Sequence, residues 1–363
     1  MQFDSVQNAK ADIFEDVFGF QAIPVAASAG MEVPLFAPRP ETAAFRNVVD
    51  GRKRRRYDAR DLISLGVLPP EGHNRNPDGF KLGIFVQRAE LLHHPLVQEA
   101  QLRARGEARV IYTGPVSRRA LNPGRHRPLR IGSSIGHYRV TAGSIGCFCM
   151  HQDGGGIGIL SNNHILADTN KASLGDVILQ PGRRDGGRRQ DPDSRVATLF
   201  SFERIDFAVN SRNLVDCAFA VLMGGIKHDS SWAHSPQTAE QWPVKSRPVQ
   251  LLPDDEVWKI GRTTGHTAGR VVAVNVDNVV VAMGAGTGQR LARFDGQISI
   301  ERSDGHFSEG GDSGALIWTR DGSPAALLFA GTERGGTTGY GLTYANPIEV
   351  VLDALNLEIH TGG

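Results

Sequence analysis

From about residue 126 to the end of the chain, short strand-like segments follow one another with turn signals between them. Asp-Gly dipeptides of the hairpin type recur at 153–154, 185–186, 295–296, 304–305 and 321–322. Few helical patterns lie between the segments. Short strands at this spacing form barrels or paired sheets. This part of the chain is therefore predicted to be all-β, as a barrel or a sandwich pair.

The expected strands are short segments separated by turn signals. They are 138–142, 146–150, 157–161, 176–180, 195–200, 216–221, 257–260, 270–276, 279–283, 296–300, 315–318, 325–330 and 341–345. After the last of them, residues 347–357 are expected to form a helix, because Ile348, Val351, Leu352 and Leu355 fall on one face.

The region before residue 126 has a different composition. Residues 80–114 predict a strand, a helix that starts at Pro95, and a second strand, which together make a small α/β module. The chain is accordingly divided into an N-terminal extension and linker at 1–75, the small module at 76–125 and the β domain at 126–363. Helices are expected at 11–20 and 61–68 within the extension.

The overall composition selects no particular class of partner. The net charge is +1, so no overall field favours nucleic acid or an anionic membrane. The basic run Arg52-Lys53-Arg54-Arg55-Arg56 is interpreted as a solvated linker, with contact to nucleic acid or an acidic partner as the alternative. The three cysteines are too few for a disulfide framework. Without a signal-peptide pattern or an 18-residue apolar run, a cytoplasmic location is expected.

One segment of the β domain carries a candidate nucleophile. Residues 308–315, Ser-Glu-Gly-Gly-Asp-Ser-Gly-Ala, place Ser313 between glycines and directly after an aspartate. A serine hydroxyl needs a neighbouring base, and its backbone must turn tightly so that N–H groups face the developing oxyanion. The tetrapeptide Gly-Asp-Ser-Gly also occurs as an ordinary turn. The interpretation therefore depends on a histidine and a carboxylate elsewhere in the chain.

His164 is the candidate base among the twelve histidines. An apolar strand, 157–161, runs into the polar pair Asn162-Asn163, and the histidine follows at the strand end. A packed core histidine is the alternative. Asp216 is the candidate carboxylate, because it precedes the apolar run 217–221, where a charge is costly to bury without a partner. A simple strand boundary is the alternative for Asp216.

The motifs around these three residues resemble those of the chymotrypsin-like serine peptidases, over about 132–355. They are Leu-Ser-Asn-Asn-His at 160–164, Val-Asp-Cys-Ala at 215–218 and Gly-Gly-Asp-Ser-Gly at 310–314. Gly-Arg-Thr-Thr-Gly-His-Thr at 261–267 and the stretch 331–348 also match. The chain looks most like the bacterial, disulfide-free branch that is related to plant narrow-leaf-type proteins. The order His, Asp, Ser is the order of that family's triad on a double β-barrel.

This resemblance implies a double β-barrel with a C-terminal helix that hydrolyses peptide bonds through an acyl-enzyme. Ser313 would attack, His164 would carry the proton and Asp216 would orient His164. The backbone N–H groups of Gly311 and Ser313 would form the oxyanion hole. A polypeptide substrate is implied, and no cofactor is expected.

The chain also departs from the family. The position that carries trypsin's pocket acid is Phe307, so cleavage after Arg or Lys is not expected, and an apolar or small residue is. Ala330 and Gly331 are expected on the strand that pairs with the substrate backbone. Arg130-Ile131-Gly132 weakly resembles an activation cleavage site. The expectation is instead an enzyme that is active as made, or one that the first 125 residues control through a regulatory partner.

Three further signals compete with this interpretation. Residues 132–136, Gly-Ser-Ser-Ile-Gly, fit a nucleophile elbow at Ser134, but that motif needs a helix after it and the next residues look extended. Cys147, Cys149 and His151 alternate along a strand and could hold zinc, although packed small side chains explain them better. A peptide-binding or regulatory module on the same scaffold, latent until a partner acts, is the alternative function.

Overall fold

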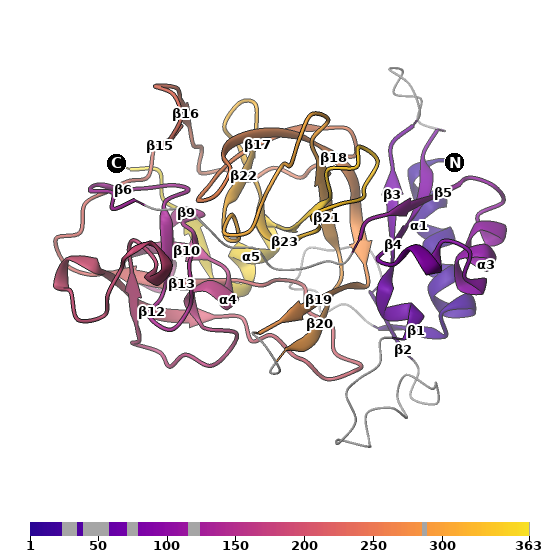
Figure 1. Ribbon diagram of the computed structural model, residues 1–363, viewed down its shortest axis with the longest axis horizontal. Coiled ribbons are helices and arrows are strands. Elements are labelled where there is room, and N and C mark those ends of the chain that lie inside the picture. Colours follow the sequence, from indigo (N-terminus) through magenta and orange to yellow (C-terminus); the bar gives the residue numbers. More distant parts are fainter. Residues whose placement is uncertain (24–34, 39–57, 71–78, 115–123, 285–288, 363) are drawn as a thin grey trace.

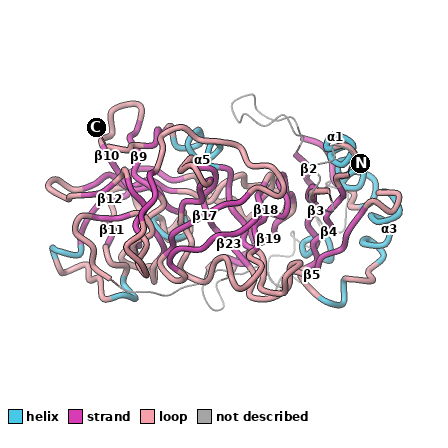
Figure 2. The backbone as a smooth tube through the Cα atoms, turned by 90° about the horizontal axis from the view of Figure 1, so that it is seen from above, coloured by secondary structure: helices cyan, strands magenta, loops and turns pink. Residues whose placement is uncertain are grey.

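The computed structural model describes residues 1–23, 35–38, 58–70, 79–114, 124–284 and 289–362. Three parts lie in a row along the long axis in both views of the backbone (Figures 1 and 2). An N-terminal module stands at one end, a closed barrel lies in the middle, and a curled sheet lies at the other end, near the C-terminus. None of the helices in the described ranges is both long and apolar enough to cross a membrane.

Within the described residues, the N-terminal module combines short helices with five strands. Its elements are α1 (Phe3–Asp12), a π-helical turn (Ile13–Val17), β1 (Phe20–Ile23), β2 (Leu35–Pro38), a 3₁₀ turn (Ala59–Leu62), β3 (Ile63–Leu68), β4 (Lys81–Val86), a 3₁₀ turn (Ala89–Leu91), α3 (Pro95–Arg103) and β5 (Ala108–Tyr112).

The curled sheet follows in the chain. Its region contains β6 (Leu129–Arg130), β7 (Ser134–His137), β8 (Gly143–Ser144), β9 (Cys147–His151), β10 (Ile157–Ser161), α4 (Asn163–Leu166), β11 (Val177–Leu179), 3₁₀ turns at Arg183–Asp185 and Pro192–Ser194, β12 (Arg195–Phe202), β13 (Ala218–Leu222) and β14 (His228–Asp229).

The closed barrel and the C-terminal segment complete the chain. They contain β15 (Trp232–His234), β16 (Gln241–Pro243), β17 (Glu256–Gly261), β18 (Gly265–Asp277), β19 (Val279–Met283), β20 (Arg290–Phe294), β21 (Gln297–Glu301), β22 (Leu316–Thr319), β23 (Pro324–Gly331), β24 (Thr343–Pro347), α5 (Ile348–Leu355) and β25 (Leu357–Ile359).

The two β units confirm the predicted double-barrel fold. In the middle unit, strands run in the order β17-β22-β23-β24-β21-β18, and β18 also pairs with β17, which closes a six-stranded barrel. In the other unit, an eight-stranded sheet in the order β25-β9-β10-β13-β12-β11-β7-β8 curls as a half-barrel. Buried apolar side chains of these strands form the cores of the two units.

The C-terminal helix joins the two β units. Helix α5 is confirmed, and Ile348, Val351, Leu352 and Leu355 of its apolar face are buried in the core of the curled sheet. After the helix, β25 pairs with β9 of that sheet, although β24 just before the helix belongs to the closed barrel. The end of the chain therefore ties one unit to the other.

The N-terminal module extends the sheet of the closed barrel. Strand β18 is 13 residues long and leaves the barrel to pair with β3, which pairs with β4. Strands β4 and β5 are parallel and are connected through α3, as the strand–helix–strand pattern predicted. At the end of β5, the Tyr112 carbonyl accepts a hydrogen bond of 2.6 Å from the Gly336 amide of the closed barrel.

Some expected elements are wrong or shifted. Residues 61–68 form a 3₁₀ turn and β3 rather than a helix, because the backbone of the buried segment 63–68 pairs with β4 along one edge and with β18 along the other. The strand expected at 138–142 is a turn between β7 and β8. The helix expected at 11–20 begins earlier, at Phe3, and ends in the π-helical turn. The basic run 52–56 lies outside the described residues.

A buried ion pair links the module to the barrel. The Lys10 ammonium of α1 lies 2.9 Å from a carboxylate oxygen of Asp277, at the end of β18, and donates to the Asn275 carbonyl at 2.7 Å. Both charged side chains are almost fully buried. The other oxygen of Asp277 accepts a hydrogen bond from the Gly296 amide. Two buried charges of this kind stabilise the fold only while both are present.

Replacing Lys10 with methionine is therefore expected to lower the free energy of unfolding by about 3–5 kcal/mol, because Asp277 keeps a buried charge without its partner. The double variant Lys10→Met/Asp277→Asn should recover most of this loss, since asparagine keeps the acceptor for the Gly296 amide. Urea unfolding followed by tryptophan fluorescence measures both variants. Equal destabilisation of the single and double variants would show that the pairing of charges is not the cause.

Candidate active site

His164 is held at the end of an apolar strand by an aspartate. Strand β10 ends at Ser161, and the short helix α4 places His164 in the interior, where its side chain is fully buried. The ring Nδ1 is hydrogen bonded to one carboxylate oxygen of Asp216, and the His164 backbone amide donates to the other oxygen at 3.1 Å. A carboxylate on Nδ1 keeps the proton on that nitrogen and leaves Nε2 as an acceptor.

Asp216 is fixed in turn by amide side chains from both β units. It lies just before β13 and is fully buried. Its backbone amide donates to the side-chain oxygen of Asn346 at 3.0 Å, and its carbonyl accepts from the side-chain amide of Asn162 at 2.7 Å. Asn346 lies on β24 of the closed barrel and donates to Gln297 on β21 at 2.6 Å. The position of the carboxylate therefore depends on both β units.

A second amide network holds the turn that carries His164. The Asn163 side chain donates to the Asn170 side chain at 2.7 Å and to the Glu203 carbonyl at 2.6 Å. Asn170 also exchanges hydrogen bonds with the backbone of Ile205. Asn170 has φ of 68°, a left-handed conformation that asparagine adopts more readily than most residues. The loop after α4 is thus locked onto the segment that leads to Asp216.

Ser313 lies across a short strand from His164. It is almost fully buried in the loop before β22, and its carbonyl accepts from the Ser144 amide of β8 at 2.8 Å. Gly143 separates the two sides, since a Cβ there would lie 2.6 Å from the Ile165 side chain and 2.8 Å from the Ser313 carbonyl oxygen. Among the described residues, the buried Nε2 of His164 has no hydrogen-bond partner. The structure thus brings His164 and Asp216 into contact, but no hydrogen bond joins His164 to Ser313.

The peptide groups around Ser313 leave two amides unused. Within the described ranges, no hydrogen bond is formed by the backbone N–H of Gly311 or Ser313. Gly311 has φ of 106°, which only glycine adopts without strain, and its carbonyl accepts from the Ser144 hydroxyl at 2.9 Å. Ser144 thereby fixes the peptide orientation on one side of the turn. Free amides beside a serine are the donors that an oxyanion requires.

Asp312 lies between these two amides in the sequence, and both oxygens of its buried carboxylate accept hydrogen bonds. Its carboxylate accepts from the amides of Thr263 at 2.7 Å and Thr264 at 3.1 Å, from the Thr264 hydroxyl, and from the Glu309 amide at 2.8 Å. The Lys259 ammonium on β17 lies 3.6 Å away, and both side chains are fully buried. Burial lowers the pKa of Lys259, and the Asp312 carboxylate opposes that shift by favouring the charged form. Asp312 thus has a buried cationic partner from within the closed barrel.

For the peptidase activity expected from the sequence, replacing Lys259 with methionine should lower kcat about a hundredfold, because a small displacement of Asp312 moves the amides of Gly311 and Ser313. The readout is steady-state hydrolysis of a peptide ester, with near-UV circular dichroism as a check on folding. Arg130→Gln, which removes the cleavage site of the alternative activation route, should keep wild-type kcat. Loss of activity in Arg130→Gln with retention in Lys259→Met would instead support activation by cleavage.

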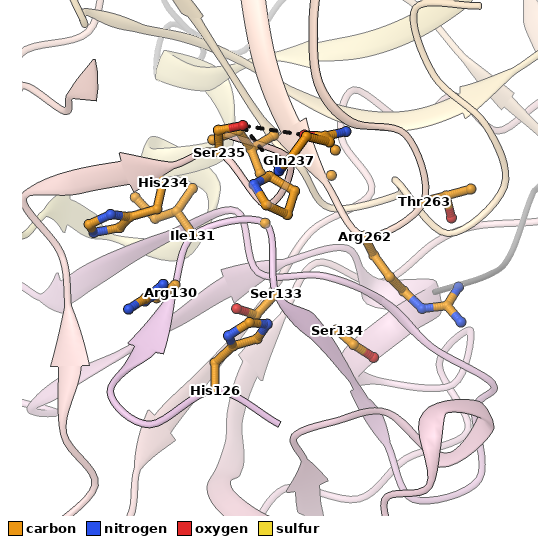
Figure 3. A pocket seen from close by; sticks show the side chains of 15 residues that line it. His126, Arg130, Ile131, Ser133, Ser134, His234, Ser235, Gln237, Arg262 and Thr263 are labelled. Carbon is orange, nitrogen blue, oxygen red and sulfur yellow. Dashed lines mark hydrogen bonds between the residues drawn. The ribbon is translucent and has the colours of Figure 1, made fainter. Parts of the chain in front are cut away.

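A cavity of about 190 Å³ lies next to the end of β17, and Figure 3 shows side chains that line it. Its wall includes Arg130 and Ile131 on one side and Arg262 and Thr263 on the other. None of His164, Asp216 and Ser313 lines it. The cavity is linked to the Asp312 turn by Thr263, which lines the cavity and donates its backbone amide to the Asp312 carboxylate.

The three residues expected to bind substrate lie in the closed barrel. Phe307 is buried in the barrel core, and its ring centre is 5.7 Å from the Lys259 ammonium. Ala330 and Gly331 end β23, where they pair with Tyr344 and Thr343 of β24. On the other side of β23, pairing with the segment after Ser313 stops at Leu328, which bonds to the Gly314 amide and the Ala315 carbonyl. The edge of 329–331 that faces away from β24 is therefore next to the candidate nucleophile.

The competing signals have structural roles. Ser134 lies in strand β7 without a following helix, and its hydroxyl bonds to Asp185 and to the Gly182 amide. The sulfur atoms of Cys147 and Cys149 lie 3.6 Å apart in the core, and burial raises the pKa of the Cys149 thiol. In the described chain, no group of three His, Cys, Asp or Glu side chains is arranged to hold a metal ion.

Three residues that contact Asp312 or the Asp216 segment were not predicted from the sequence: Lys259, Gln297 and Asn346. A lysine between Trp258 and Ile260 in an apolar strand is a detectable signal, because a buried ammonium requires an anionic partner. Asn346 and Gln297 give no comparable signal. Their contacts with the Asp216 segment exist only after the two β units have come together.

No protein-family model matches this chain. No curated protein sequence matches it either. Among solved structures, it is similar to Thermobifida fusca protease A, with 17% identity and a TM-score of 0.44, over 64% of this chain and 99% of that one. It is also similar to Cellulomonas bogoriensis chymotrypsin, with 17% identity and a TM-score of 0.43, and to a Nocardiopsis protease, with 16% identity and a TM-score of 0.45. Each of these similarities covers 64% of this chain and 99% of the other chain. At this identity the likeness concerns the fold alone, and the fold assignment rests on the strand pairing.

Proposed function

We propose that this chain is a serine endopeptidase that cleaves polypeptides through an acyl-enzyme. The observation that carries the proposal is the buried His164–Asp216 pair, with Nε2 left as a free acceptor, across β8 from a serine flanked by unused amides. In the reaction, Nε2 of His164 takes the Ser313 proton as the hydroxyl attacks the scissile carbonyl. The imidazolium then donates that proton to the leaving amine, and a water repeats the sequence to release the acid.

The supporting residues fit specific steps of this reaction. Asp216 holds the Nδ1 proton and stabilises the imidazolium, and the amides of Gly311 and Ser313 are suited to bind the oxyanion. The open edge of 329–331 is suited to pair with an extended substrate backbone. The gap between Ser313 and His164 is compatible with catalysis, because catalytic hydrogen bonds are often long in an enzyme without substrate and tighten on binding.

The direct test is digestion of a mixed library of peptides with the purified full chain, followed by mass spectrometry of the new termini. Wild type and Ser134→Ala are expected to generate new termini, and Ser313→Ala to generate none. New termini in the Ser313→Ala sample at the wild-type rate would refute the proposal.

A peptide-binding module is the second candidate, and the missing hydrogen bond between Ser313 and His164 is the observation that favours it. A module of this kind would bind peptides along the same edge and release them intact. In the digestion experiment it would give no new termini in any variant, although labelled peptides would still bind with measurable affinity.

A further inference from the structure

An open hollow of about 660 Å³ lies beside the turn that carries His164. Three segments line it: residues 169–171 after α4, residues 204–208 between β12 and β13, and Arg290 at the start of β20. In Figure 1, α4 and the β19–β20 hairpin both lie below the closed barrel. The hollow is thus formed between elements of both β units.

The hollow is directly connected to the His164 turn. Asn170 in its wall bonds to Asn163, which is the residue before His164, and to the backbone of Ile205 on the opposite wall. Asp206 in the same wall donates its amide to Asn213, three residues before Asp216. A polypeptide that reaches Ser313 in an extended conformation advances about 3.3 Å per residue. The hollow lies beside the segments that carry His164 and Asp216, so a substrate held at Ser313 needs only a few residues to extend from the candidate site toward it.

The charge of the hollow is strongly positive. Lys171, Arg204 and Arg290 line it, and Asp206 is the one carboxylate in its wall. The carboxylate of Asp206 accepts from the Ala208 amide, which holds it within its own turn. In the described part of the chain, neither Lys171, Arg204 nor Arg290 forms an ion pair. All three are exposed, so that their charges are available to a ligand.

An aromatic ring supports one of these cations. The Arg290 guanidinium lies 3.8 Å from the centre of the Phe207 ring, a cation–π contact that restricts the side chain. Phe207 and the buried Ile205 give the hollow an apolar floor. A rigid guanidinium over an apolar floor is suited to a planar carboxylate on a short aliphatic stem.

We propose that this hollow binds an acidic side chain, Asp or Glu, of the polypeptide substrate, a few residues from the scissile bond. The inference rests on the proposed function, since it assigns a preference to the same substrate. It predicts that segments with acidic residues close to the cleavage point are cleaved and bound in preference to neutral ones. It also predicts that this preference weakens as salt rises, because exposed charges are screened.

The test separates binding from cleavage. Two fluorescein-labelled peptide pools that differ only in Glu against Gln are titrated onto full-length Ser313→Ala, and anisotropy is measured at low and high salt. The Glu pool is expected to bind about tenfold more tightly at low salt, the combined effect of a few exposed charge pairs. The triple variant Lys171→Gln/Arg204→Gln/Arg290→Gln should remove this difference.

A control triple variant, Arg109→Gln/Arg184→Gln/Arg320→Gln, changes the net charge equally at exposed sites elsewhere. It should retain the preference for the Glu pool. Equal binding of the two pools, or an equal loss in the control, would overturn the inference. If wild type cleaves neutral and acidic peptides equally well, the inference fails while the proposed function stands. If the Glu pool binds preferentially and nothing is cleaved, the hollow is supported and the peptidase proposal fails.

Discussion

Replacing Asp216 with asparagine is expected to lower kcat about 10⁴-fold with little change in the structure. Asparagine has nearly the same shape, so its oxygen can still accept from the His164 amide at the position where Asp216 does. The side-chain NH₂ would face Nδ1, however, and would favour the tautomer with the proton on Nε2. His164 could then no longer take the proton of Ser313, and the charge that stabilises the imidazolium would be lost.

The measurement is steady-state hydrolysis of one peptide substrate, with circular dichroism to confirm folding. Asp353→Asn is a matched control, because Asp353 is exposed on α5 and far along the chain from these residues. It should retain kcat within about twofold. A loss of less than about tenfold in Asp216→Asn would mean that Asp216 is only a structural partner of His164.

Replacing Ser313 with alanine is expected to remove peptide hydrolysis by a factor of about 10⁴ or more, because the covalent route is closed. Stability should hardly change, since the Ser313 hydroxyl makes no hydrogen bond in the described part of the structure. The free energy of unfolding and the rate of hydrolysis are measured on the same preparation.

Ser134→Ala is the natural control for Ser313→Ala. Ser134 bonds to Asp185 and to the Gly182 amide, so its loss is expected to cost about 1 kcal/mol of stability and no activity. The two serines thus predict opposite patterns. If hydrolysis survived in Ser313→Ala and disappeared in Ser134→Ala, the nucleophile would be Ser134 and the choice of Ser313 would be wrong.

The parts of the fold that sequence could predict are those with strong local signals. Strands 157–161 and 279–283 match the structure residue for residue, because each is a short apolar segment bounded by turn signals. Helix α5 forms within the expected range because its apolar residues fall on one face. His164 and Asp216 could be picked out because each stands at the boundary of an apolar strand, where a buried polar group needs a partner.

The parts that sequence could not predict depend on pairing between distant segments. Residues 63–68 form a strand because β4 and β18 pair with its two edges and satisfy its backbone, and β18 lies some 200 positions away in the chain. The bonds that Asn346 and Gln297 make to the Asp216 segment likewise exist only across the two β units. Local propensity contains no information about such contacts.

The most direct test of the central claim is reaction of the full wild-type chain with a fluorophosphonate, followed by peptide mapping of the adduct. Such a probe phosphonylates a serine that a base activates, because the serine oxygen bonds to phosphorus and displaces fluoride, and oxyanion donors stabilise the phosphonyl oxygen. The account predicts one adduct, on the peptide that contains Ser313, and none in Asp216→Asn on the same time scale. The absence of an adduct on the wild-type chain, or an adduct on Ser134, would contradict it.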